Sequence, residues 1–359
     1  MISPPEVEVI TVHTAQEHLA GLFPEEIAGR LEAEVPPYRA RQIFSWLHRQ
    51  AAASFQEMTS LPRALIEELE KRFQSPWPLE LVTSRLSADG TEKYLFALED
   101  GSTIETVLLP EKRRQTVCLS TQVGCAMNCS FCATGQAGFR RDLTAGEIAA
   151  QVLFVQNRLK AQGKTVTNVV YMGMGEPLAN YQAVLRSARL LNHPEGLNLG
   201  ARRLTISTCG LVPQIRALAE EELQVNLAVS LHAADDRRRG EIMPINKVYP
   251  LEELLAACDY YTARTNRRIS YEYALISGIN DSPQAAQKLS DLLQGRLCHV
   301  NLIPVNPGSG AARPSSARIA AFAQMLERAG IPVSLRKERG SDIEAACGQL
   351  RQRTLEGQG

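Results

Sequence analysis

The run Cys125-Ala-Met-Asn-Cys129-Ser-Phe-Cys132 contains three cysteines at C-x3-C-x2-C spacing, and the rest of the chain is best understood from it. Three thiolates can hold three irons of a four-iron cluster, which leaves the fourth iron open to a cofactor or substrate. The alternative is a structural zinc knuckle, which normally has four Cys or His ligands. The sequence has no second C-x-x-C pair, and the nearest following histidine is His193. The run therefore predicts a catalytic 4Fe-4S cluster held by Cys125, Cys129 and Cys132.

The composition favours a soluble enzyme of the cytoplasm. With 359 residues and 44% hydrophobic content, the chain can build one large domain and a small one. It has no apolar run long enough to span a membrane, and its start, Met1-Ile-Ser-Pro-Pro5, does not resemble a signal peptide. Eight cysteines, three of them clustered, do not form the pattern of a secreted disulfide framework. A net charge of zero argues against a uniformly basic nucleic-acid binder but allows local basic patches.

The sequence pattern changes twice along the chain. Amphipathic stretches at 39–47 and 60–73 predict a small N-terminal helical domain, and two β-rich runs around the Asp100-Gly101 turn then predict a hairpin. From about residue 115 strands and helices alternate. The expected domains are a helical accessory (RNA-binding) domain at 1–85, a β-rich linker or extension at 86–114, an α/β barrel at 115–352 and a tail at 353–359.

The alternating part predicts a parallel (βα)6 partial barrel. The six expected strands are Gln115 to Ser120, Asn168 to Met172, Arg203 to Thr208, Val225 to Leu231, Ile269 to Leu275 and His299 to Val305, and Pro332 to Arg336 is a candidate seventh.

Unusual residues follow the carboxyl ends of these strands, where the loops of a parallel barrel carry its chemistry. They are the cysteine loop, the run Gly173-Met-Gly-Glu-Pro177, Ser207, the run Ser230-Leu-His232, and Asn306. Each alone is explained by a tight turn, a strand-end cap or a structural histidine. At successive strand ends, however, they can line a single cofactor pocket.

The cysteine spacing, with the aromatic Phe131 before the third cysteine, resembles the signature of the radical S-adenosylmethionine superfamily. Further motifs narrow the resemblance to the dual-specificity RNA methyltransferase (RlmN) family. They are Cys118, Gly-Met-Gly-Glu-Pro at 173–177, Ser-Leu-His-Ala at 230–233, Asn-Leu-Ile-Pro-Val-Asn-Pro at 301–307 and Asp-Ile-Glu-Ala-Ala-Cys-Gly-Gln-Leu at 342–350. The resemblance covers about residues 39 to 349.

The resemblance implies a reaction and its residues. Family members methylate carbon 2 of an adenosine in the peptidyl-transferase region of 23S rRNA, and some also methylate the adenosine beside the anticodon of tRNA. Two S-adenosylmethionine molecules would be used per turnover, and one would bind the open iron of the cluster. The implied cofactor contacts are Gly175, Glu176, Ser207, Ser230, Leu231, His232 and Asn306, and the implied catalytic residues are Glu105, Cys118 and Cys347.

Carbon 2 of adenine is electrophilic, so ordinary methyl transfer has no nucleophile there and a radical route is required. In the family's scheme Cys347 is methylated, its methyl group becomes a radical and the RNA is tethered through that sulfur. Glu105 accepts a proton, and Cys118 then attacks the Cys347 sulfur and releases the RNA, leaving a disulfide. Without the resemblance, Glu105 would be explained by a position on a solvated edge strand. Cys118 and Cys347 would be explained as buried structural thiols.

Two other functions stay open from sequence alone: methylation of carbon 8 by the related antibiotic-resistance type of enzyme, and a non-catalytic, metal-dependent RNA-binding module. The expected partners are 23S rRNA and tRNA, together with a reducing partner such as a flavodoxin system. We expect a monomer with no membrane partner.

Basic residues predict where RNA docks. Arg140-Arg141 and Arg237-Arg238-Arg239 follow the cysteine loop and the fourth strand, and so belong to the active-site end of the barrel. Arg202-Arg203 and Arg267-Arg268 precede strands and belong to the opposite end. We therefore expect the first set to contact phosphates, together with Lys247 and the helix that carries Arg39, Arg41 and Arg49.

Overall fold

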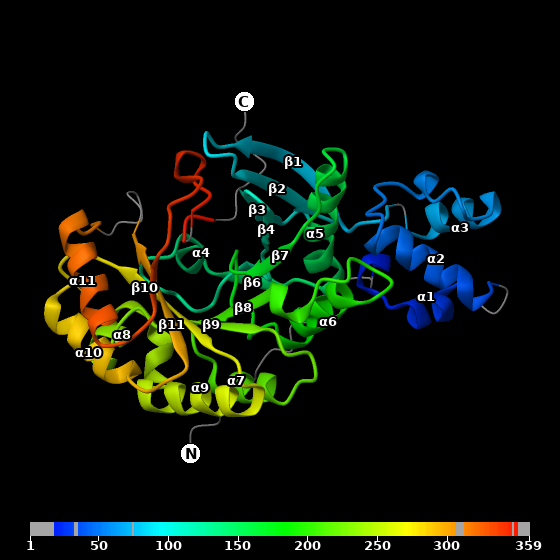
Figure 1. Ribbon diagram of the computed structural model, residues 1–359. Helices are drawn as coiled ribbons and strands as arrows, with labels where there is room; N and C mark the ends of the chain where they lie inside the picture. The colour runs from blue at the N-terminus through cyan, green and yellow to red at the C-terminus, as the bar shows by residue number, and fades with distance from the viewer. Residues whose placement is uncertain (1–17, 32–34, 74, 306–311, 347, 351–359) are drawn as a thin grey trace, which may run out of the picture.

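A computed structural model describes residues 18–31, 35–73, 75–305, 312–346 and 348–350. Its centre is a ten-stranded sheet in the order β1-β2-β3-β4-β7-β8-β9-β10-β11-β12 (Figure 1). Every neighbouring pair from β4 to β12 is parallel, and every pair from β1 to β4 is antiparallel. The sheet thus joins an antiparallel extension to a parallel partial barrel.

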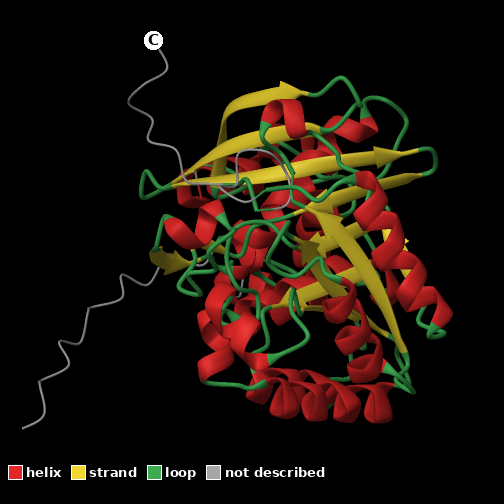
Figure 2. Ribbon diagram, turned by 90° about the vertical axis from the view of Figure 1, so that its left-hand side faces the viewer, coloured by secondary structure: helices red, strands yellow, loops and turns green. Residues whose placement is uncertain are grey.

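The predicted (βα)6 partial barrel is confirmed, together with its seventh strand. Its strands are β4 (Arg114–Cys118), β7 (Asn168–Tyr171), β8 (Leu204–Thr208), β9 (Asn226–Ser230), β10 (Ile269–Leu275), β11 (Cys298–Pro304) and β12 (Val333–Leu335). Helices pack on the outer side of these strands (Figures 1 and 2). They are α5 (Ala145–Lys160), α6 (Tyr181–Asn192), α7 (Val212–Ala219), α9 (Leu251–Thr265), α10 (Pro283–Leu293) and α11 (Ser316–Arg328). The short helix α8 (Asp236–Ile242) instead lies beside the cysteine loop, where Ile242 packs with Met127 and Phe131.

The inner side of the barrel is not packed like the outer side. Along β8 and β11, buried residues alternate strictly with half-buried ones. Leu204 and Ile206 of β8 belong to the main hydrophobic core, whereas Thr205 and Ser207 are the half-buried positions. Strands covered on both faces would be buried throughout. The alternation therefore indicates an open interior.

The antiparallel extension consists of β1 (Leu79–Leu86), β2 (Glu92–Leu98) and β3 (Thr103–Glu111). The hairpin predicted around Asp100-Gly101 is confirmed as β2 and β3. The helical domain expected at 1–85 extends too far, however, because β1 begins within it. This strand has no buried residue, so the alternation of apolar residues that would mark a strand facing a core is weak.

Short elements surround the cysteine loop. β5 (Gln122–Gly124) and β6 (Phe139–Asp142) form a separate two-stranded sheet before and after it, and α4 (Ala133–Gln136) begins directly after Cys132. Sequence analysis had predicted none of these three elements.

The N-terminal helices α1 (Pro24–Arg30), α2 (Pro37–His48) and α3 (Arg63–Phe73) lie to one side of the barrel (Figure 1). They form a core of their own, in which Ile43, Phe44 and Leu47 are fully buried as the amphipathic pattern predicts. Ala145 of α5 and Leu190 of α6 belong to the same core, so the helical part is packed onto the barrel. None of the helices in the described ranges has the length and apolarity needed to cross a membrane.

Candidate active site

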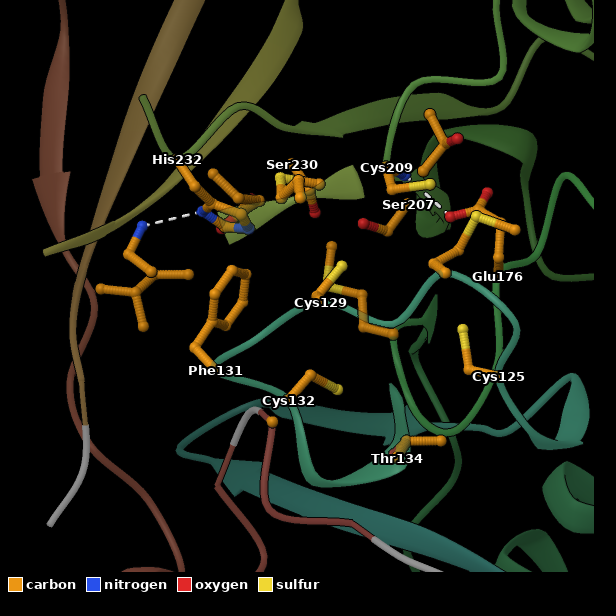
Figure 3. A pocket seen from close by; sticks show the side chains of 18 of the residues that line it. Cys125, Cys129, Phe131, Cys132, Thr134, Glu176, Ser207, Cys209, Ser230 and His232 are labelled. Carbon is orange, nitrogen blue, oxygen red and sulfur yellow. Dashed lines mark hydrogen bonds between the residues drawn. The ribbon is translucent and has the colours of Figure 1, made fainter. Parts of the chain in front are cut away.

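The three cysteines of the C-x3-C-x2-C run line one cavity at the carboxyl end of the parallel strands, which we call the cluster cavity (Figure 3). Cys125 follows β5, and its N–H donates to the carbonyl of Gly138 at 2.9 Å. Burial, with a smaller contribution from the nearby charges of Cys132 and Glu176, raises the pKa of the Cys125 and Cys129 thiols to about 12. Three thiols facing one cavity fit the predicted cluster, because bound iron would stabilise them as thiolates.

The glycine-rich loop after β7 packs directly on the chain that leads from β4 to the cysteines. Gly175 has a φ of +104°, and a Cβ atom there would lie 2.7 Å from the side chain of Gln122. A Cβ on Gly173 would lie 2.7 Å from the carbonyl of Leu119. Close contact with residues 119–122 therefore requires glycine at both positions. Both glycines also line the cluster cavity, and Gly175 is one of the predicted cofactor contacts.

Glu176 lines the cluster cavity and is 4% exposed. One carboxylate oxygen accepts the N–H of Cys209 at 2.8 Å, and the other accepts the N–H of Leu178 at 3.0 Å. Burial raises the pKa of Glu176, and these hydrogen bonds oppose the rise. The side chains of Thr208 and Cys209 also donate to the carboxylate, so the ammonium of a methionine moiety, the predicted contact, would share the carboxylate with these donors.

His232 is held in one orientation against the cysteine loop. Its backbone is left-handed, with a φ of +57°, and its ring lies edge-on to Phe131 with centroids 4.8 Å apart. Nδ1 accepts the N–H of Ala274 at 2.9 Å, which places the ring proton on Nε2. Burial lowers the pKa of His232 to about 3. The imidazole is therefore neutral near pH 7 and presents an N–H donor.

Other predicted cofactor contacts fall into three groups. Ser207 and Ser230, on β8 and β9, line the cluster cavity as predicted. Leu231 is fully buried and does not line it, although its N–H donates to the carbonyl of Glu272 at 3.0 Å. Asn306 lies outside the described residues.

Arg239 is not part of a basic surface, which corrects the RNA footprint predicted for Arg237 to Arg239. Its side chain is 0% exposed and donates to the carbonyls of Cys209, Ser230 and Leu231 at 2.6 to 3.1 Å, and to Asn246 Oδ1 at 2.9 Å. The guanidinium therefore ties the ends of β8 and β9 together beside the cavity. Arg238 is half-buried and pairs with Glu241 at 3.4 Å, and Arg237 is exposed.

Glu272 on β10 is a residue of the site that sequence analysis missed. It lines the cluster cavity and is 5% exposed, and its Oε1 accepts the side-chain N–H of Asn301 at 2.8 Å. Its Oε2 makes no hydrogen bond and lies 3.8 Å from the guanidinium of Arg336. Burial raises the pKa of Glu272. A glutamate within the apolar run Ile269 to Leu275 was the signal that could have identified it.

Glu105 is buried on β3 in an ion pair with Lys93 of β2, with Oε1 and Nζ 3.0 Å apart. Lys93 Nζ also donates to the carbonyl of Glu344 at 3.0 Å. The carbonyl of Glu105 accepts the hydroxyl of Ser120 at 2.6 Å, so the residue lies beside the chain that leads to the cysteine loop. Because Glu105 is buried, a position on an exposed edge strand does not explain it. It does not line the cluster cavity.

Cys118, at the end of β4, lines a second cavity of about 600 Å³ in the interior of the barrel, which we call the barrel cavity. The two cavities share walls, including Met172 and Arg336. Cys347 lies outside the described residues, but Ala346 before it lines the barrel cavity and Gly348 after it lines the cluster cavity.

Two family models match the chain: the Radical SAM superfamily over residues 119–289, and the ribosomal RNA large subunit methyltransferase N-terminal domain over residues 31–74. A probable dual-specificity RNA methyltransferase RlmN from Desulfitobacterium hafniense is 50% identical over 89% of this chain and 92% of its own. One from Moorella thermoacetica is 48% identical over 94% and 98%. The crystal structure of a radical SAM methyltransferase from Sphaerobacter thermophilus is 52% identical, with a TM-score of 0.91 over 94% of this chain and 99% of that chain.

Proposed function

Because the chain belongs to the RlmN family of radical S-adenosylmethionine RNA methyltransferases, we propose that it methylates carbon 2 of one adenosine in 23S rRNA and of the adenosine beside the anticodon of tRNA. When bound, the cluster and S-adenosylmethionine would supply the radical that this position requires. Membership of this family also means that the protein is an enzyme and not a non-catalytic RNA-binding module.

The chain's own residues support a division of labour between the two cavities. In the cluster cavity, Cys125, Cys129 and Cys132 would hold the cluster, and Glu176 and the His232 Nε2–H would orient the cofactor as acceptor and donor. Ser207 and Ser230 offer hydroxyls on the same wall. These contacts would orient the cofactor before reaction.

We further propose that Cys347 carries the methyl group and that Cys118 resolves the adduct. The Cys118 thiolate would attack the Cys347 sulfur, so that an S–S bond forms as the bond from that sulfur to the methylene carbon breaks. The methylated adenosine leaves with the bonding electrons and a proton, and the disulfide is later reduced. The observation that carries this proposal is the position of Cys118 in a cavity that is also lined by Ala346, the residue next to Cys347.

The experiment uses anaerobically prepared, cluster-containing enzyme with an RNA fragment. Cys118→Ala is expected to stop with RNA linked to Cys347, whereas Cys298→Ala, which replaces a buried cysteine of β11 outside both cavities, should turn over. Mass spectrometry of digested nucleosides separates 2-methyladenosine from 8-methyladenosine. Normal turnover by Cys118→Ala, or an 8-methyl product, would overturn the corresponding part of the proposal. The role of Glu105 as proton acceptor, a flavodoxin-type reductant and a monomeric state stay predictions.

A further inference from the structure

Lys93 on β2 is a buried cation, and its position calls for an explanation. The neighbouring Tyr94 and Phe96 are in contact with Phe154 of α5, on the outer side of the sheet. Because side chains alternate along a strand, Lys93 points to the other side. Its side chain is only 4% exposed. A buried ammonium costs free energy unless it is paired, and even a buried ion pair is often no more stable than apolar side chains in its place. Stability alone therefore does not account for this lysine.

The strand register places Lys93 in one row with Cys118. Lys93 lies opposite Val107 of β3, and Val107 lies opposite Cys118 of β4. Residues directly opposite each other share one face of a sheet, and both Val107 and Cys118 line the barrel cavity. Glu105 is two residues before Val107 and so points to the same face. The ammonium, the carboxylate and the thiol therefore lie on the same side of three adjacent strands.

The ammonium of Lys93 joins two parts of the chain that take part in the proposed reaction. Nζ lies 3.0 Å from Glu105 Oε1, and it donates to the carbonyl of Glu344, also at 3.0 Å. Glu344 stands three residues before Cys347, and the two residues that follow Glu344 line the barrel cavity. A hydrogen bond from a charged donor is stronger than one between neutral groups. This contact therefore fixes the backbone before Cys347 at a defined distance from Glu105.

Other contacts hold the same segment at different places. The turn between β1 and β2 forms hydrogen bonds with Asp342 and Gly340, and the N–H of Ala133 in α4 donates to the carbonyl of Gly348 at 2.8 Å. These bonds anchor the segment to the antiparallel extension and to the cysteine loop. The Lys93 contact differs from them because it ties the segment to the predicted proton acceptor.

We propose that Lys93 is a positioning residue of the methyl transfer: its ammonium holds the backbone that leads to Cys347 beside Glu105 and within reach of Cys118. This inference rests on the proposed function and adds to it the residue that brings the two thiols together. Lys93 acts through the groups that it holds and takes no part in the bond changes.

The first experiment measures how readily Cys118 and Cys347 form a disulfide, without RNA and without turnover. Anaerobic, cluster-containing enzyme is equilibrated with mixtures of reduced and oxidised glutathione. Two protein thiols and one glutathione disulfide then give one protein disulfide and two molecules of reduced glutathione. The remaining thiols are alkylated, and mass spectrometry of peptides quantifies the Cys118–Cys347 disulfide. The equilibrium constant is the effective concentration of one thiol at the other, which reports their positioning as long as circular dichroism shows a folded protein.

The comparison is between Glu105→Gln and Lys93→Met/Glu105→Gln, because both lack the buried carboxylate and only the second lacks the ammonium. We expect an effective concentration at least tenfold lower in the double variant, since a hydrogen bond from a charged donor shifts an equilibrium by about tenfold or more. Tenfold corresponds to a rise of about 30 mV in the reduction potential of this two-electron couple. Lys288→Met, which removes a lysine paired with Asp235 from the outer helix α10, should leave the potential unchanged. Equal potentials for Glu105→Gln and the double variant would overturn the inference.

The second experiment uses single substitutions that keep Glu105. Lys93→Met should form methyladenosine at least tenfold more slowly than wild type, whereas Lys93→Arg keeps a cation and should retain most of the rate. Reductive cleavage of S-adenosylmethionine without RNA should be unchanged in both, because Lys93 does not line the cluster cavity. Equal losses of cleavage and of product would indicate a general structural defect and overturn a positioning role. The first experiment decides the inference if Lys93→Met does not fold. A wild-type enzyme that forms no Cys118–Cys347 disulfide in any glutathione mixture would instead contradict the proposed function.

Discussion

Replacing Arg239 by methionine tests whether this arginine is structural or binds RNA. Methionine keeps an unbranched side chain of similar length but removes every donor. The fully buried guanidinium makes four hydrogen bonds, three of them to carbonyls at the ends of β8 and β9 and one to Asn246. In Arg239→Met these four acceptors lose their donor, and water has little access to replace it.

The expected loss of stability follows from that count. A buried acceptor left without a hydrogen bond costs about 1–3 kcal/mol. The carbonyl of Leu231 keeps a hydrogen bond from the N–H of Ala233 at 2.8 Å, so three of the four acceptors are counted. At the lower bound they give a loss of about 3 kcal/mol, a large part of the 5–15 kcal/mol by which proteins are usually stable. At about 2 °C per kcal/mol for a large domain, the melting temperature should fall by roughly 6 °C or more. Binding of S-adenosylmethionine should weaken as well, because Ser230 and Cys209 line the cluster cavity.

The assay compares Arg239→Met with Arg238→Met, since Arg238 is the half-buried neighbour that pairs with Glu241 at the surface. Thermal unfolding is followed by circular dichroism under anaerobic conditions, and RNA binding is measured at several salt concentrations. Arg238→Met should melt within about 1 °C of wild type, because a surface ion pair contributes roughly 0–1 kcal/mol. If Arg239→Met melts like wild type and instead flattens the salt dependence of RNA binding, then Arg239 contacts phosphate and our reasoning is wrong.

Two further predictions concern buried charge. Lys93→Met removes the ammonium that pairs with Glu105, which should lower the free energy of unfolding by about 3–5 kcal/mol. The double variant Lys93→Met/Glu105→Gln should melt at a higher temperature than Lys93→Met, because the unpaired buried carboxylate is also removed. Equal melting temperatures for these two variants would contradict this reasoning. Burial lowers the pKa of His48 to about 3, whereas in the unfolded chain its pKa is near 6.5. Between these two pH values the unfolded chain binds a proton at His48 that the folded chain does not bind. The stability of the fold therefore falls as the pH drops from about 6.5 toward 3. His48→Leu should therefore reduce the fall in melting temperature between pH 6.5 and pH 5, and an unchanged pH dependence would exclude His48 as a contributor.

The sequence predicts the barrel well because its strands carry two independent signals. Each is an apolar run flanked by turn residues, and most are followed by a polar motif at the carboxyl end. All six expected strands, and the seventh, lie within two residues of the observed bounds. The strand β1 has neither signal, since it has no buried residue and no motif follows it.

Side-chain direction is what the sequence could not supply. Arg237, Arg238 and Arg239 are adjacent in sequence, and strand-end position alone assigns them the same role. On the short helix α8, however, successive residues point about 100° apart, so Arg239 turns toward β8 and β9 while Arg238 faces solvent. Lys93 was likewise only a residue of a predicted strand, because its pairing with Glu105 depends on the register between β2 and β3.

The antiparallel extension has a structural purpose that explains why it is joined to the barrel. A partial barrel is open between its first and last strands, here β4 and β12, and the chain after β12 leads across to the extension. The Gly340 N–H donates to Asp89 at 3.1 Å, and Asp342 accepts the hydroxyl of Ser87 at 2.6 Å. These bonds fix the segment just before Cys347 to the turn between β1 and β2, which itself belongs to the same sheet as β4. The described residues just before Cys347 are thereby anchored, through hydrogen bonds, to the sheet that contains β4, the strand that carries Cys118.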